Sequence, residues 1–151
     1  MVAVMSPCAG QLTALSEVND PVFNSYTVGD GIAVTPANAG EVTVCAPCSG
    51  KAIRVMPHAF VILTEEKTGI LVHVGIDTVQ LKGEGFDVLV EQGCHVDMGQ
   101  AMVRYTPQEV ADKGLDPVVL IVAMDSARGD AQLTKLSPGD KVETGAPLFH
   151  L

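Results

Sequence analysis

The sequence contains no tryptophan, and aromatic residues make up only 4% of it. Basic side chains are also few: 9 Lys and Arg stand against 18 Asp and Glu, so the formal net charge is −9. Binding to nucleic acid or to an anionic membrane needs a basic face, and stacking on bases needs aromatic side chains. We therefore expect no nucleic-acid partner and no direct insertion into a membrane, whereas a basic protein partner would suit this surface.

Long hydrophobic runs are absent as well. The longest apolar run, Val118 to Met124, is far shorter than the roughly 20 residues that a membrane-spanning helix needs. The N-terminal residues Met1 to Cys8 lack the basic segment and long apolar segment of a secretory signal. These features predict a cytoplasmic protein whose cysteines are reduced thiols.

The cysteines are 4 in number, and two of them form the motif Cys45-Ala46-Pro47-Cys48. A redox-active pair needs its first cysteine at a helix N-terminus, but here the motif follows a predicted strand and enters a turn. A structural zinc site needs a second pair of ligands at similar spacing, and Cys8 and Cys94 each stand alone. The favoured interpretation is that these are small buried side chains.

The chain is punctuated by 15 Gly and 9 Pro, with short runs rich in Val, Ile, Leu and Thr between them. This pattern is typical of an all-β sandwich or barrel. The predicted strands are Gln11–Leu15, Gly31–Pro36, Glu41–Ala46, Ala52–Val55, Ala59–Thr64, Ile70–Gly75, Ala101–Tyr105, Pro117–Ala123 and Pro147–Leu151. One short helix is predicted over Pro107–Lys113, with Thr106 as its N-cap and Gly114 as its end. No stretch resembles a linker, so residues 1–151 are expected to form a single domain.

The sequence contains two kinds of internal repeat. Ser6–Gly10 resembles Ala46–Gly50, and Gly93–Val103 resembles Gly139–Phe149. Both copies of the first kind come before both copies of the second kind along the chain. An element of the first kind is therefore expected to pair with a distant element of the second kind. We therefore predict an antiparallel β-sandwich with an internal pseudo-twofold duplication and at most short helices.

Two histidines lie in apolar runs on either side of the polar segment Glu65–Gly69. If these runs form a hairpin with its turn between Glu65 and Glu66, His58 lies directly opposite His73. Opposed side chains share one face of a sheet, with Cβ atoms about 5 Å apart.

The same strand pattern puts Gly75 and Asp77 on the face of His73, with Gly75 leaving room beside the imidazole. Two neighbouring imidazoles can act as a nucleophile and a hydrogen-bond donor to an anion. They can alternatively bind zinc together with a carboxylate or water. His95 and His150 lie beside the glycine-rich repeats and are predicted to be surface residues.

The segment His73–Phe86 resembles the signature of the glucose-type enzyme IIA domain of the bacterial phosphoenolpyruvate-dependent sugar phosphotransferase system. Pro57–Phe60 matches the second histidine motif of that family. Asp20–Phe23, followed by Val28–Val34, matches a third block. The resemblance extends over nearly the whole chain.

The resemblance implies that His73 accepts a phosphoryl group on Nε2 from the carrier protein HPr. The group then passes to a cysteine on the enzyme IIB domain of a sugar permease. His58 would orient and hydrogen-bond the phosphate, and no cofactor would be required. The acids Asp20 and Asp77 would meet basic residues of the partners. The implied apolar docking residues are Phe23, Val22, Val28, Leu71 and Val79.

Two positions depart from the family pattern. Met56 stands where a hydroxyl residue often helps to orient the histidines, and Arg54 replaces an apolar surface residue. Two other functions stay open at this point. One is a regulatory binding module whose unphosphorylated form docks permeases or kinases. The other is a zinc hydrolase, although zinc held by His58, His73 and a carboxylate of a partner is the better zinc hypothesis.

Overall fold

The computed structural model describes every residue from Met1 to Leu151. Its strands are β1 (Ala3–Met5), β2 (Gly10–Ala14), β3 (Gly29–Pro36), β4 (Val42–Cys45), β5 (Gly50–Met56), β6 (Ala59–Leu63), β7 (Gly69–Val74), β8 (Phe86–Val88), β9 (His95–Val96), β10 (Ala101–Tyr105), β11 (Val119–Met124), β12 (Gln132–Leu133), β13 (Lys141–Val142) and β14 (Pro147–His150). The helices are α1 (Pro21–Asn24) and α2 (Pro107–Asp112), with 3₁₀ helices η1 (Leu15–Glu17) and η2 (Thr78–Leu81).

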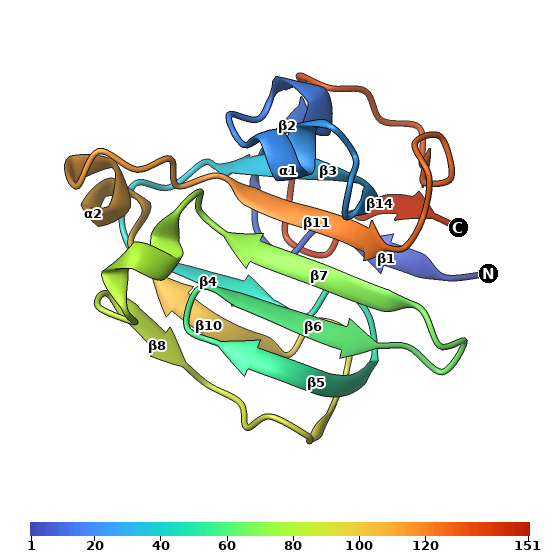
Figure 1. The fold of residues 1–151 in the computed structure, drawn as a ribbon, viewed down its shortest axis with the longest axis horizontal. Helices are drawn as coiled ribbons and strands as arrows, with labels where there is room; N and C mark the ends of the chain where they lie inside the picture. The colour runs from blue at the N-terminus through green and yellow to red at the C-terminus, as the bar shows by residue number, and fades with distance from the viewer.

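The strands form an antiparallel sandwich, as predicted. One sheet has 8 strands in the order β13-β2-β3-β11-β7-β6-β5-β9. Two sheets of 3 strands, β1-β14-β12 and β4-β10-β8, lie behind it (Figure 1). Buried side chains of all three sheets form one continuous hydrophobic core between the layers. The chain termini lie next to each other at one side of the molecule.

The predicted duplication is visible in the strand pairing. Gly10 in β2 pairs with Val142 in β13, and Gly50 in β5 pairs with Val96 in β9. Each first-kind repeat therefore pairs with a distant second-kind repeat, as the sequence predicts. The order of the large sheet is symmetric about the β11–β7 pair, and the two smaller sheets are equivalent in the same way.

Every predicted strand is present, with ends displaced by about two residues at most. The prediction of a single helix is incomplete: α2 begins at Pro107 with Thr106 in the N-cap position, but α1, η1 and η2 were not expected. These elements have at most 4 residues, which is too short for a periodic sequence signal. Neither α2 nor any other helix is long and apolar enough to span a bilayer.

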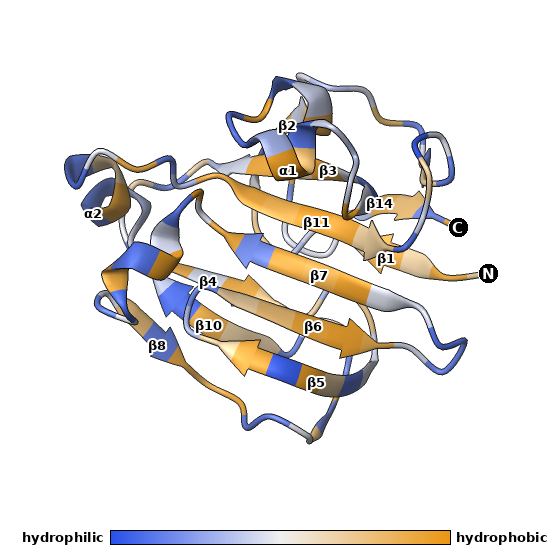
Figure 2. Ribbon diagram, viewed as in Figure 1, coloured by the Kyte–Doolittle hydropathy of each residue, from blue (hydrophilic) through white to orange (hydrophobic).

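Strand β7 separates the two apolar regions of the protein. Alternate side chains of β7, among them Val72 and Val74, enter the core between the sheets. Leu71 lies on the opposite face and packs against a smaller cluster that includes Phe23 of α1. The alternation puts His73 on this outer face. Figure 2 shows β7 as mostly hydrophobic, with a hydrophilic stretch near its C-terminal end.

The β6–β7 register differs from the prediction by one residue. Ala59, and not His58, pairs with His73. The register follows from the turn, which is closed by a backbone hydrogen bond from the Thr64 N–H to the Thr68 carbonyl. The Thr68 N–H also donates one hydrogen bond to the Thr64 hydroxyl. The turn is centred on Glu66, whereas the sequence prediction placed the centre between Glu65 and Glu66.

Candidate functional site

The structure brings the two imidazoles together in spite of the changed register. The ring centroids of His58 and His73 are 5.3 Å apart, with an interplanar angle of 74°. Met56 pairs with Ala59, so His58 lies in a two-residue turn beyond the ends of β5 and β6. Its side chain is therefore free of the strand alternation and can point towards His73.

The hydrogen bond of His73 determines which ring nitrogen is free. Its Nδ1 lies 2.6 Å from the carbonyl oxygen of Gly75. A carbonyl oxygen only accepts hydrogen bonds, so Nδ1 carries the proton and Nε2 keeps its lone pair. Burial lowers the pKa of His73, although the Gly75 hydrogen bond and the nearby Asp20 and Asp77 oppose this effect. The imidazole is therefore neutral at pH 7, with Nε2 available as a nucleophile.

Aromatic rings lie on two sides of His73. The ring of Phe23 is 5.2 Å from the His73 ring, centroid to centroid, at an angle of 59°. His58 is half-buried, burial lowers its pKa, and its ring makes no hydrogen bond to the protein. Phe23 itself is only 7% exposed. It therefore forms a wall of the site, and its assignment to the docking surface stays a prediction.

Asp20 caps helix α1, which forms one edge of the site. Its carboxylate accepts a hydrogen bond of 2.9 Å from the backbone N–H of Val22 and caps α1. Pro21 in the first turn suits this helix start, because its missing N–H is not needed there. The short helix then buries Phe23 and leaves Val22 51% exposed at the rim.

Asp77 and Val79 form another edge. Asp77 is exposed, has a φ of 60° and precedes η2, in which Val79 is 59% exposed. Val28 and Leu71 are half-buried and pack against the outer apolar cluster. The exposed apolar rim of the site therefore consists of Val22 and Val79.

Gly75 has a different role from the one predicted. Its φ of 81° ends the strand alternation, so Asp77 does not simply follow His73 on one face. A Cβ added at Gly75 would lie 2.4 Å from Cγ2 of Thr78. The predicted free space beside the imidazole is therefore filled by Thr78, and glycine is required by the backbone conformation.

Met56 and Arg54 lie on the same face of the sheet as His73. Met56 pairs with Ala59, which pairs in turn with His73 on the next strand. The Arg54 guanidinium Nη2 lies 4.0 Å from the sulfur of Met56. Arg54 therefore adds an exposed positive charge beside the site, and no hydroxyl group stands at position 56.

The prediction that the cysteines are buried holds for two of them, whereas Cys45 and Cys94 are half-buried. None of the 4 forms a disulfide, and Cys8 and Cys48 are buried. Burial raises the pKa of each of these two thiols to about 12. Such thiols are neutral and unreactive at pH 7.

A zinc centre is not assembled by this chain alone. No group of three or more His, Cys, Asp and Glu side chains is arranged to hold a metal ion. A catalytic zinc needs three protein ligands. His58 and His73 supply two at most, so the zinc hydrolase hypothesis lacks its third ligand, and a zinc ion shared with a partner stays a prediction.

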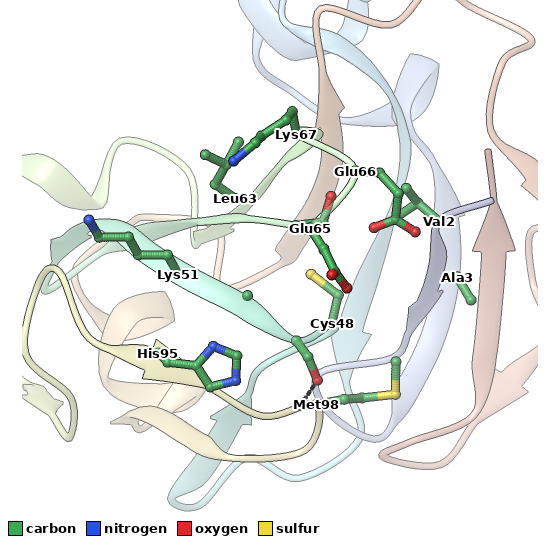
Figure 3. Close-up of a pocket in the computed structure, with 13 residues that line it drawn as sticks. Val2, Ala3, Cys48, Lys51, Leu63, Glu65, Glu66, Lys67, His95 and Met98 are labelled. Carbon is green, nitrogen blue, oxygen red and sulfur yellow. Dashed lines mark hydrogen bonds between the residues drawn. The ribbon is translucent and has the colours of Figure 1, made fainter.

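A cavity of about 680 Å³ lies at the beginning of β5 and the end of β6, away from the two histidines (Figure 3). It is lined by residues such as Cys48, Glu66 and His95, and it contains neither His58 nor His73. His95 is exposed, as predicted, with its Nε2 3.3 Å from Oδ1 of Asp97. His150 is half-buried in β14, so its prediction as a surface residue is only partly met.

The lowered pKa of His73 leads to a prediction about how its protonation depends on pH. Because the pKa of His73 is lowered, its NMR titration should have a midpoint below the value of about 6.5 found for histidine in unfolded peptides. Protonation removes the lone pair of Nε2, so the reactivity of His73 as a nucleophile should be constant above this midpoint and fall as the pH drops through it. A midpoint above that of an unfolded His-containing peptide would contradict the assignment.

Two features of the site were missed at the sequence level. The Gly75 carbonyl as the partner of His73, and the hydroxyl of Thr78, were not identified. A glycine two positions after a histidine at a strand end is a weak sequence signal for the hydrogen bond between His73 and Gly75. The position of the Thr78 hydroxyl depends on a turn that the sequence pattern does not reveal.

Comparisons with known proteins identify the family of this chain. A family model for the phosphoenolpyruvate-dependent sugar phosphotransferase system, EIIA 1, matches residues 2–129. The glucose-specific EIIA component of Oceanobacillus iheyensis is 36% identical over 122 residues, covering 79% of this chain and 73% of that protein. The glucose-specific EIIBCA component of Corynebacterium glutamicum is 37% identical over 147 residues, or 89% of this chain.

This chain spans between 20% and 23% of the length of three larger relatives, including the C. glutamicum protein. The solved structure of glucose permease IIA from Mycoplasma capricolum matches with a TM-score of 0.84 and 34% identity. That match covers 98% of this chain and 94% of the other. The chain therefore belongs to the glucose-type enzyme IIA family of the bacterial sugar phosphotransferase system.

Proposed function

We propose that this chain is a phosphocarrier that accepts a phosphoryl group from phospho-HPr on Nε2 of His73 and passes it to a cysteine of an enzyme IIB domain. The observation that carries the proposal is the hydrogen bond of 2.6 Å between His73 Nδ1 and the Gly75 carbonyl. It holds the neutral ring in the tautomer whose Nε2 can attack phosphorus.

The first step exchanges one phosphorus–nitrogen bond for another. Nε2 of His73 attacks the phosphoryl group, the bond between phosphorus and the donor histidine breaks, and the donor nitrogen keeps the electron pair. The proton on His73 Nδ1 stays in place. In the second step a cysteine thiolate attacks phosphorus and a phosphorus–sulfur bond forms. The bond between phosphorus and Nε2 breaks, and Nε2 of His73 keeps the electron pair.

His58 and Phe23 assist this chemistry in different ways. The centroid of the His58 ring lies 5.3 Å from that of His73, and the His58 ring makes no hydrogen bond within the protein. It is therefore free to hydrogen-bond phosphoryl oxygens. Phe23 excludes water from one side of His73. Phosphoryl transfer requires charge stabilisation and correct positioning of the reacting groups. Exclusion of water slows hydrolysis of the phosphohistidine.

The rim fits a basic partner with an apolar centre. Val22 and Val79 are exposed, and Asp20 and Asp77 lie close enough to influence the pKa of His73. With a net charge of −9, the protein would attract a positively charged partner. The names of relatives that combine EIIA with IIB and IIC favour an enzyme IIB domain as acceptor. We also infer one enzyme IIA domain over residues 1–151, working in the cytoplasm.

The direct test is incubation with phosphoenolpyruvate, enzyme I and HPr, followed by intact mass measurement. We expect one added phosphate that is lost on acid treatment, as for a phosphohistidine. Addition of an enzyme IIB domain should then remove it. No added phosphate, with enzyme I and HPr shown to be active on another acceptor, would refute the proposal.

Replacing Val79 with Ser should weaken partner docking without unfolding the protein. The side chain is 59% exposed, so little of the core depends on it. Loss of its apolar contact area on docking corresponds to about 1 kcal/mol, or roughly a fivefold to tenfold rise in the KM for phospho-HPr. The kcat should be unchanged. Met98→Ser, at a 46% exposed residue beside the distant cavity, is the control and should leave both constants unaltered.

The exposed pair Val22 and Val79 also favours a second function, regulation of a partner by docking. Phosphorylation adds roughly −1.5 to −2 charges beside this apolar rim. A partner that recognises the unphosphorylated surface should therefore be released. Co-purification of a permease or kinase that is retained after phosphorylation would contradict this function.

A further inference from the structure

The geometry points to Thr78 as a positioning residue that fixes the tautomer of His73 by holding the Val74–Gly75 backbone. This inference rests on the proposed role of His73 as nucleophile. Thr78 is 1% exposed and yet carries a hydroxyl group. Its hydroxyl donates a hydrogen bond of 2.6 Å to the carbonyl oxygen of Val74.

This hydrogen bond takes the place of a missing ladder bond. The N–H of Val74 donates to the carbonyl of His58 at 2.7 Å, as in a regular antiparallel pair. In such a pair the carbonyl of Val74 would accept from the N–H of His58, but here it accepts from Thr78 instead. The N–H of Val74 is thereby held by His58 and its carbonyl by Thr78. Val74 directly follows His73 in the chain.

Thr78 also packs directly against Gly75. Its Cγ2 would be 2.4 Å from a Cβ at Gly75, and the carbonyl oxygen of Asp116 would be 3.1 Å away. On the far side the N–H of Gly75 donates to Val118 and the N–H of Ile76 donates to Asp116, both at 2.8 Å. The Gly75 peptide is therefore held from both sides.

The consequence for His73 follows from the direction of the Gly75 carbonyl. That carbonyl is the only hydrogen-bond partner of the His73 ring, and it fixes the proton on Nδ1. If the turn relaxes, the carbonyl can rotate away, and the proton can then move to Nε2. The ring that results has its nucleophilic lone pair on the wrong nitrogen.

The test compares three variants by ¹⁵N NMR of the unphosphorylated protein, which reports the tautomer of His73 without any carrier present. Thr78→Val keeps the shape but removes the hydroxyl, whereas Thr78→Ser keeps the hydroxyl. Thr64→Val is the matched control. Thr64 is also a buried threonine, 4% exposed, and its hydroxyl closes the turn at the opposite end of the β6–β7 hairpin.

We expect Thr78→Val to raise the fraction of the Nε2–H tautomer and to slow phosphoryl acceptance by about tenfold to a hundredfold. Thr78→Ser should restore the wild-type tautomer and rate, and Thr64→Val should change neither. If Thr78→Val does not fold, Thr78→Ala makes the same prediction. A wild-type tautomer in the variant lacking the hydroxyl, failure of serine to rescue, or an equal change in Thr64→Val would overturn the inference.

The two proposals can fail separately. If the wild-type protein takes up no phosphate but Thr78→Val still shifts the tautomer, the positioning role stands and the phosphocarrier role falls. If the wild-type protein is phosphorylated on His73 and the tautomer is insensitive to Thr78, only the positioning role is refuted.

Discussion

Replacement of His73 by Gln is expected to abolish phosphoryl acceptance, so that the protein mass is unchanged after incubation with phosphoenolpyruvate, enzyme I and HPr. The amide nitrogen of glutamine has no available lone pair, so it cannot attack phosphorus as Nε2 of an imidazole can. Glutamine is similar to histidine in size and is tolerated at a half-buried position. Loss of phosphorylation with an unchanged thermal unfolding curve would therefore reflect chemistry and not misfolding.

His95→Gln provides the matched control for this experiment. His95 is exposed at the distant cavity and hydrogen-bonds only Asp97, so this variant should be phosphorylated as fast as the wild type. Acid-labile phosphate on the His73→Gln protein would show that another residue is the acceptor. Loss of phosphate in His95→Gln would lead to the same conclusion.

The sequence was sufficient to predict the longer strands because their composition and their Gly and Pro boundaries are local signals. It was also sufficient to predict which distant strands pair, since the repeats mark equivalent places: Gly10 and Gly50 both pair with valines of the second repeat. The short strands of 2 or 3 residues were missed. Their pairing is imposed by neighbouring strands, and no local pattern encodes it.

For the β6–β7 hairpin, the sequence predicted correctly that His58 and His73 are close, but with a wrong strand register. Proximity of His58 and His73 was expected from direct opposition on adjacent strands. In the structure it comes from the position of His58 in a turn, where the side chain is not restricted to alternate faces. The register depends on the backbone hydrogen bond between Thr64 and Thr68 that closes the turn, and the turn sequence gave no signal for this.

Details that depend on backbone conformation were beyond the sequence. The alternation of a strand predicted open space at Gly75, but the chain leaves the strand there with a positive φ and Thr78 fills the space. Likewise, the sequence did not show that the capped turn at Asp20 directs the Phe23 ring inward against His73. Both details follow from short irregular segments, whose side-chain directions depend on tertiary packing.

Replacement of His58 by Gln is expected to separate the two halves of the transfer. The variant should still accept phosphate, because Nε2 of His73 remains free while Nδ1 is held by Gly75, and because the donor site helps to hold the phosphoryl group. Transfer to the enzyme IIB cysteine should slow by at least about a hundredfold, the typical cost of losing a donor that stabilises transition-state charge. The attacking thiolate adds negative charge to an already anionic group, so the second step depends more strongly on the His58 hydrogen bond.

The measurement is single-turnover transfer from the purified phosphorylated variant to enzyme IIB, which needs no further phosphorylation during the assay. Its phosphate content before mixing serves as the internal control for acceptance. If onward transfer from His58→Gln is as fast as from the wild type, His58 does not stabilise the phosphoryl group, and its contact with His73 is a packing contact only. If acceptance and transfer are slowed equally, His58 acts by supporting the position of the His73 ring, because a defect in the nucleophile itself affects both steps.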